Sequence, residues 1–183
     1  MRRGPFDMSA PNPISPTLVN QTRVNPTLAL WQKRSQSRLG RWLFTRALCR
    51  RAPYFASINP YFIELRPALC IVHIPWRRGT SGQGNTVHPL AIATLCELAA
   101  STVTEVTLPA VMSWHSRGMT IEYLRRAESD VTATARLDKA EWGEAQNVAV
   151  PVSAVDRNGT EVVRAVITVR VESAGTRSAR WPS

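Results

Sequence analysis

Acidic residues are scarce in this chain of 183 residues, which has 13 Asp and Glu against 23 Lys and Arg and a net charge of +10. The imbalance is local, since residues 1–57 hold ten basic residues and the single acid Asp7, whereas the remainder is nearly neutral. No helix-turn-helix, zinc-finger or aromatic-basic strand pattern accompanies the charge. Nucleic acid is therefore not a predicted partner.

Cysteine and long apolar runs are also sparse. Cys49, Cys70 and Cys96 are odd in number and far apart in apolar surroundings, which argues against a disulfide framework or a zinc site and favours small core hydrophobes. No apolar run approaches 18 residues and none follows the basic N-terminus, so we expect no spanning helix, no secretory signal and a cytoplasmic location. His73 and His115 lack suitably spaced partners, and neither a metal nor a cofactor is predicted.

The chain divides by composition into four segments. Residues 1–16 contain four prolines without periodicity and are predicted to be a disordered leader. An N-terminal helical segment is expected over 17–57, the folded domain over 58–172, and a flexible tail over 173–183.

The segment from about Thr27 to Arg51 has the spacing of one basic amphipathic helix with Gly40 as a weak point. Its basic stripe consists of Arg34, Arg38 and Arg41. We expect Trp31, Trp42 and Leu43 to pack on the folded domain with the arginines outward. A location on an anionic membrane surface is the alternative for this helix.

The folded domain begins with two strands in residues 56–76, which are predicted to form a hairpin broken at Arg66-Pro67. A mostly apolar, buried helix follows over about 86–104. Only alternating segments come after it, over 118–127, 130–138, 146–155 and 160–172. Asn158-Gly159 favours a type I′ hairpin turn between the last two.

This order predicts an α+β protein in which a six-stranded, mostly antiparallel sheet wraps around one central helix, since a single apolar helix is the natural cover for one face of the sheet. That arrangement is the hotdog fold, here with an extra N-terminal amphipathic helix.

Two stretches carry a family resemblance, "NTVHPLAIATLCELA" from Asn85 and "MTIEYLRRAESDVTATARL" from Met119. They resemble the hotdog-fold thioesterases of the phenylacetate-pathway type and an allied branch known only as a domain of unknown function. "GRWLFTRALCRRAPYFASI" and "ELRPA" resemble the same branch, so the likeness covers about residues 38–172. The resemblance implies an acyl-coenzyme A thioesterase that hydrolyses a fatty or aromatic thioester.

The resemblance assigns catalysis to Glu97, as nucleophile or as general base for water, and to Asn85 and His88, which would hold the thioester carbonyl or the attacking water. In the thioesterases that the sequence resembles, two glycines usually follow the motif histidine. A backbone N–H at that place polarises the thioester carbonyl. Here Pro89 and Leu90 stand in those places, and only Leu90 and its successors could donate.

Each of these residues also has a structural interpretation. Glu97 could belong to a solvated stripe on the helix with Thr94, Ser101, Thr104 and Glu105. Asn85 could be an ordinary helix N-cap, and His88 a structural residue of the first turn.

Four further positions are candidates for binding substrate. Arg77, Arg78 and Arg117-Gly118 are expected in turns near the helix entrance, where guanidinium groups could contact a coenzyme A pyrophosphate. Exposure to solvent is the alternative for them.

The predicted assembly is a homodimer, with pairing into tetramers left open, because six strands leave an exposed edge. A non-catalytic protein that binds a fatty acyl or aromatic group is the second functional interpretation, favoured by Pro89-Leu90.

Overall fold

A computed structural model of the chain describes residues 25–138, 142 and 144–173. The predicted leader, and all of the predicted tail except Ser173, lie outside the described residues. Nothing in the structure tests these two segments.

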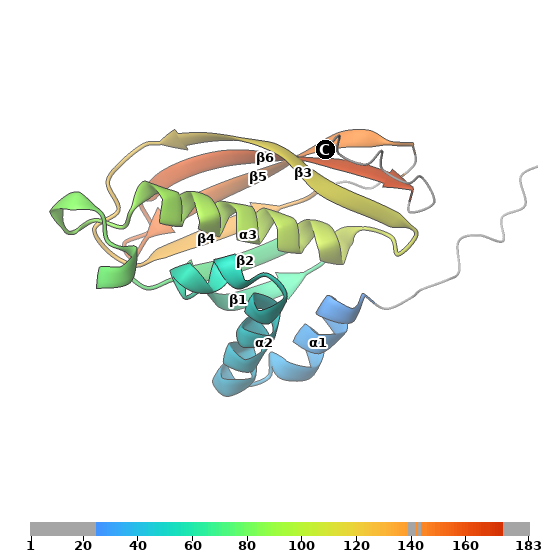
Figure 1. Cartoon of the computed structure of the whole chain (residues 1–183), viewed down its shortest axis with the longest axis horizontal. Helices are drawn as coiled ribbons and strands as arrows, with labels where there is room; N and C mark the ends of the chain where they lie inside the picture. The colour runs from blue at the N-terminus through green and yellow to red at the C-terminus, as the bar shows by residue number, and fades with distance from the viewer. Residues whose placement is uncertain (1–24, 139–141, 143, 174–183) are drawn as a thin grey trace, which may run out of the picture.

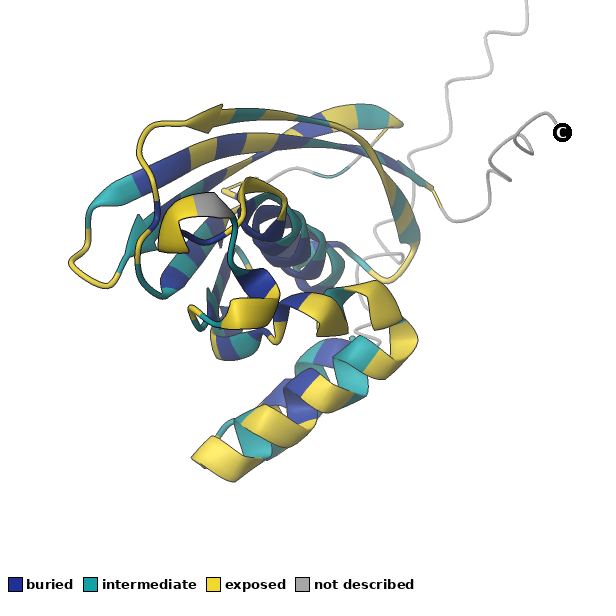
Figure 2. Cartoon of the chain, turned by 60° about the vertical axis from the view of Figure 1, so that its left-hand side comes forward, coloured by how far each residue is buried: buried dark blue, intermediate teal, exposed yellow. Residues whose placement is uncertain are grey.

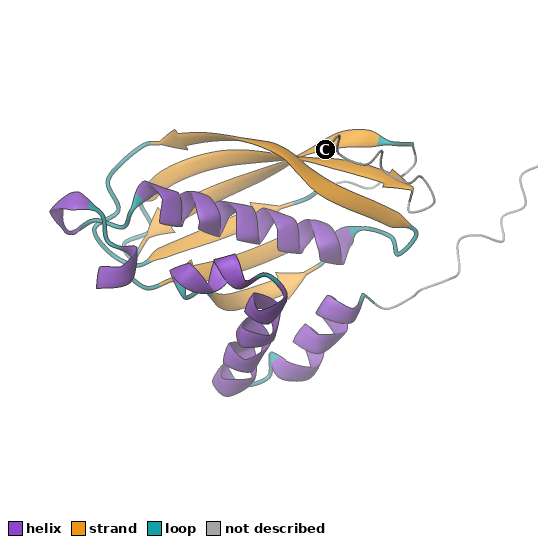
Figure 3. Cartoon of the chain, in the orientation of Figure 1, coloured by secondary structure: helices purple, strands orange, loops and turns teal. Residues whose placement is uncertain are grey.

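Six antiparallel strands form one curved sheet around a central helix, α3 (Figures 1 and 3). In chain order the strands are β1 (Tyr61–Arg66), β2 (Leu69–Ile74), β3 (Met112–Tyr123), β4 (Val131–Arg136), β5 (Gln146–Asp156) and β6 (Glu161–Ser173). Their order in the sheet is β1-β2-β4-β5-β6-β3. The predicted hotdog fold and its first hairpin are confirmed.

Helix α3 (Pro89–Thr107) begins three residues later than predicted. The residues before it are held in extended conformation, since the Val87 N–H donates to the Ala127 carbonyl at 2.7 Å and the His88 N–H to the Thr80 carbonyl at 2.8 Å. Pro89 then occupies the first turn, where its missing N–H costs nothing. By length and composition α3 could cross a membrane, but its apolar face is buried against the sheet.

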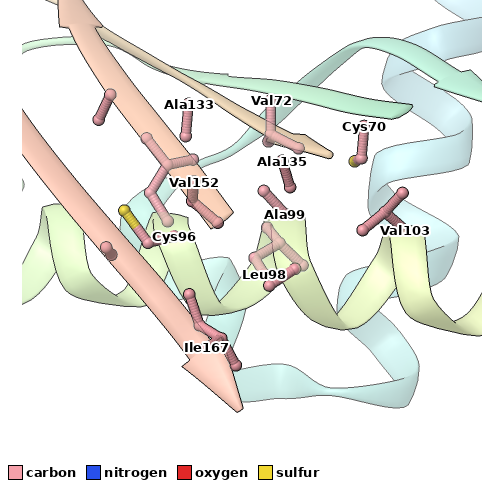
Figure 4. Close-up of a cluster of buried hydrophobic side chains, with 14 of the residues drawn as sticks. Cys70, Val72, Cys96, Leu98, Ala99, Val103, Ala133, Ala135, Val152 and Ile167 are labelled. Atoms are coloured by element: carbon pink, nitrogen blue, oxygen red, sulfur yellow. The ribbon is translucent and has the colours of Figure 1, made fainter. Parts of the chain in front are cut away.

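The core lies between α3 and the inner face of the sheet (Figure 4). Side chains of four strands meet the helix there: Cys70 and Val72, Ala133 and Ala135, Val152, and Ile167. The alanines of β4 allow the helix to approach the sheet closely. Cys70 and Cys96 are fully buried, as predicted, and burial raises the pKa of Cys96 to about 12.

The N-terminal segment forms two helices, α1 (Pro26–Arg34) and α2 (Arg38–Arg51), followed by the 3-10 helix η2 (Pro53–Ile58); the prediction of one helix is wrong. The break has a local cause, because the Ser37 hydroxyl accepts a hydrogen bond from the Gly40 N–H and caps α2. A Cβ at Gly40 would lie 1.9 Å from the Arg34 carbonyl oxygen, so only glycine fits this close approach.

Both helices share the core of the sheet through three aromatic rings. The Trp31 and Phe44 ring centroids are 5.1 Å apart, and Phe44 and Phe62 of β1 are 5.2 Å apart, both edge to face. The expected burial of Trp42 and Leu43 is wrong, since they are 48% and 38% exposed. Because the helix breaks between α1 and α2, the buried face of α2 does not continue that of α1. Phe44 points into the core in place of Trp42 and Leu43.

Two connections also differ from the prediction. In the β5–β6 turn only Gly159 has a positive φ, of +80°, so the turn is not type I′; the Asp156 carboxylate organises it by accepting from the N–H groups of Asn158 and Thr160. Strand β3 begins at Met112, six residues earlier than predicted, and the pairing with β6 skips Arg117 in a β-bulge.

Candidate active site

Glu97 lies in a cleft of about 410 Å³ on the side of α3 that faces α2, η2 and β3. The residues that line the cleft are Thr27, Leu48, Arg51, Ala52, Phe55, Glu97, Leu98, Ser101, Thr102, Glu105, Trp114, His115 and Ser116. The aliphatic and aromatic members provide a surface for an apolar group beside two carboxylates of α3, Glu97 in mid-helix and Glu105 nearer its C-terminal end.

The Glu97 carboxyl is half-buried, and this burial raises its pKa above the usual range. A hydrogen bond from Ser116 opposes the shift only in part, since it favours the ionised form. A carboxylate with a raised pKa is a stronger base than a solvated one, which suits it to take a proton from water.

Ser116 reaches Glu97 because of the bulge in β3. Before the bulge, every second side chain of β3, including Trp114 and Ser116, points toward α3. After the bulge, the side chains that point inward are Met119 and Ile121. An extra residue shifts the alternation by one, so both halves of the strand present a side chain to the helix. Sequence reasoning missed Ser116, although the spacing of Met112 and Trp114 was the available signal.

The other polar residues of the α3 stripe have structural partners. Glu105 accepts a hydrogen bond from the Thr27 hydroxyl at 2.5 Å, and its carbonyl accepts from the Asn25 amide at 2.7 Å, which attaches α1 to α3. Thr104 is fully buried and donates to the Ala100 carbonyl. These contacts contradict a uniformly solvated stripe.

His88 and Leu90 lie at the N-terminus of α3, where they bind each other. The Leu90 N–H donates to His88 Nδ1 at 3.1 Å, so the histidine is the N-cap and occupies the N–H that was expected to polarise a carbonyl. The N-cap interpretation of Asn85 is wrong. Asn85 belongs to the 3-10 helix η4 (Gln83–Asn85), has a φ of +62°, and its carbonyl accepts from the Trp76 indole at 2.9 Å.

The structure does not bring the three candidate catalytic residues together within one chain. Glu97 lies nine positions after His88, which is about 13 Å along a helix. His88 and Leu90 instead border a separate hollow of about 210 Å³, beside Thr80, Ser81 and Tyr54.

The candidate substrate-binding arginines are also divided. Arg77 and Arg78 lie before and at the start of the 3-10 helix η3 (Arg78–Thr80), near the start of α3 as expected. One Arg77 Nη donates to the Ser57 carbonyl at 2.7 Å, and its buried Nε has no acceptor among the described residues. The placement of Arg117-Gly118 in a turn is wrong, since both lie in the middle of β3.

The histidines, cysteines and acids of the described residues form no metal site. Within residues 25–138, 142 and 144–173, no three His, Cys, Asp or Glu side chains are grouped so as to hold a metal ion. His73 is half-buried beside the Thr132 hydroxyl, 3.1 Å from Nδ1, and burial lowers its pKa. His115 lines the Glu97 cleft, a position that its sequence spacing did not indicate.

The curved six-stranded sheet and its central helix define the chain as a hotdog-fold protein. A family model described as "Domain of unknown function (DUF4442)" matches residues 40–171, and the chain belongs to this family. Comparison with curated proteins finds no match.

Solved structures agree with this fold. A structural-genomics target is 38% identical, with a TM-score of 0.72, over 81% of this chain and 98% of its own. A thioesterase from Haemophilus influenzae is 13% identical, with a TM-score of 0.63, over 73% of this chain and 91% of its own. A thioesterase family protein from Silicibacter pomeroyi is 16% identical, with a TM-score of 0.61, over 70% of this chain and 96% of its own. At these two lower identities the likeness concerns the fold.

Proposed function

We propose that the protein is a cytoplasmic acyl-coenzyme A thioesterase, in which Glu97 activates water for attack on a fatty or aromatic thioester. The observation that carries the proposal is the half-buried Glu97 carboxylate, with its raised pKa, in a cleft that also presents aliphatic and aromatic side chains. Leu48, Phe55 and Trp114, which are only partly buried, offer the acyl group a surface. The thioesterase names of the two structural neighbours support the same reaction class.

The proposed site is shared between two copies of the chain. Strand β3 is an edge strand, paired only with β6 among the described residues. Its Ser116 binds Glu97, while its Tyr123 hydroxyl donates to the Pro89 carbonyl at the start of α3. If the β3 strands of two copies pair antiparallel, the end of β3 near Glu97 in one copy lies beside the end near the α3 N-terminus in the other copy. Glu97 of one copy would then face His88 and Asn85 of the other.

Sedimentation at micromolar concentration should show a homodimer, because pairing of the β3 edges covers an otherwise exposed strand. A sharper measurement uses two single variants, Glu97→Gln and His88→Ala, each expected to be inactive alone. Mixed dimers carry one intact site, so an equal mixture unfolded and refolded together should recover about a quarter of wild-type hydrolysis. A monomer, or a mixture as inactive as its components, would contradict the shared site.

A non-catalytic acyl-binding protein is the second candidate, and one observation favours it. Pro89 has no N–H, and the Leu90 N–H is already bound to His88, so the first turn of α3 offers a carbonyl fewer free donors than a glycine pair would. A reaction then depends on rotation of the His88 ring or on donors from the second copy.

Hydrolysis of a panel of acyl-coenzyme A thioesters separates the two candidates. Short, long and aromatic acyl groups are compared by release of free thiol, and binding of the same compounds is measured by calorimetry. We expect turnover of at least one apolar acyl group. Binding across the panel without thiol release would establish the acyl-binding function instead.

A further inference from the structure

The outward face of α2 combines exposed apolar side chains with arginines. Its members are Arg38, Leu39, Trp42, Leu43, Arg46 and Arg50, all exposed, and we call this set the α2 face. At 3.6 residues per turn they fall within an arc of about 140°. Phe44 of the same helix points the other way, into the core.

The apolar members of this face are unusually open for a folded protein. Leu39 is 66% exposed and lies one turn before the exposed Trp42 and Leu43. The Arg46 guanidinium lies 5.3 Å from the centre of the Trp42 ring, so the indole is flanked by positive charge as well as by leucines. Adjacent exposed apolar side chains of this kind mark a contact surface.

The charge around this face has one sign. Between Asn25 and Ile63 the sequence has seven Lys and Arg and no Asp or Glu. The ion pairs found in the described part of the chain all lie outside α1 and α2. The two helices project from the edge of the sheet beside β1, so the face is accessible (Figures 1 and 2).

We propose that the α2 face docks the protein on an anionic lipid surface, with Leu39, Trp42 and Leu43 inserted among the headgroups and the arginines against the phosphates. Leucine and tryptophan on one helical face, flanked by arginines, are the pattern of an interfacial helix. This inference goes beyond the proposed reaction and does not depend on it.

Two other occupants fit the face less well. A second copy docked through the same surface would place arginines against arginines, and like charges oppose such contact. Nucleic acid would satisfy the arginines but leave three apolar side chains against a phosphate backbone. A bilayer interface satisfies both kinds of side chain.

The test is co-sedimentation of the full chain with vesicles of phosphatidylcholine, with and without phosphatidylglycerol. We expect binding only to the anionic vesicles, weakened by added salt because the contacts are electrostatic. Arg46→Gln with Arg50→Gln should weaken binding on the order of 10-fold or more, since each basic residue near such a surface contributes about fivefold. Leu39→Ser with Leu43→Ser should weaken it similarly at constant charge.

The matched control is Arg125→Gln with Arg126→Gln, two exposed arginines after β3 that change the net charge equally. This variant should bind as the wild type does, and thermal unfolding verifies that all variants are folded. Equal loss in the control, or no binding by the wild type, would overturn the proposal. Wild-type binding to duplex nucleic acid but not to vesicles would assign the face to nucleic acid. Loss of self-association in the leucine variant without any loss of vesicle binding would assign it to a second copy.

Discussion

Glu97→Gln should lower acyl-coenzyme A hydrolysis by on the order of 10²–10⁴-fold, the usual contribution of a positioned base. The substitution keeps the size of the side chain and its helix propensity but removes the basic oxygen. Ser116 can still donate to the amide oxygen of the substituted side chain, so the geometry of the cleft should persist. Measurement of kcat and KM with the best substrate of the panel should show the loss mainly in kcat.

Glu105→Gln is the matched control for this variant. It makes the same change on the same helix, about 12 Å further along, at a carboxylate that holds the Thr27 hydroxyl. Hydrolysis should remain within a few-fold of wild type, because the amide oxygen can still accept that hydrogen bond. Equal rates for wild type and Glu97→Gln would remove Glu97 from the mechanism.

The Glu97→Gln substitution should also leave the stability of the protein intact. The raised pKa of Glu97 means that the folded chain holds the ionised carboxylate less well than the unfolded chain does. This destabilisation is present at pH above the folded-state pKa and disappears as pH falls below the unfolded value. Glu97→Gln should therefore unfold no earlier than wild type at neutral pH, as expected for a residue retained for function.

The sequence predicted the sheet and the central helix because their apolar periods are long and regular. Alternation over 146–155 and 160–172 identifies β5 and β6, and the apolar run after Pro89 identifies α3. Glu97 was found for the same reason, since a carboxylate inside that run is conspicuous. These features depend on neighbours in sequence, which one chain displays directly.

The features that sequence reasoning missed depend on single residues that interrupt a period. The bulge at Arg117 hid the first half of β3, and with it Ser116. The Ser37 cap divided the N-terminal helix and reversed the expected burial of Trp42. In both cases tertiary contacts decide which side chains point inward after the interruption. A periodic pattern that is continued across the interruption therefore assigns the wrong side chains to the buried face.

Trp31→Ala should destabilise the protein by roughly 3–5 kcal/mol, the usual cost of removing a large buried aromatic side chain. The Trp31 ring is 6% exposed and packs edge to face on Phe44. It therefore joins α1 to α2 and, through Phe62, to β1. A loss of this size should lower the melting temperature by roughly 10 °C in a chain of this length.

Trp42→Ala is the control, since it removes the same type of side chain from an exposed position on the neighbouring helix α2. Its effect should be within about 0.5 kcal/mol, apart from the small contribution of the Arg46 contact. Thermal or urea unfolding of the two variants in parallel measures the difference. Equal stabilities would mean that α1 is not held by the aromatic cluster. A large loss for Trp31→Ala alone would show that the N-terminal helices are a structural part of the hotdog domain, which gives α2 a fixed position from which to present its outward face.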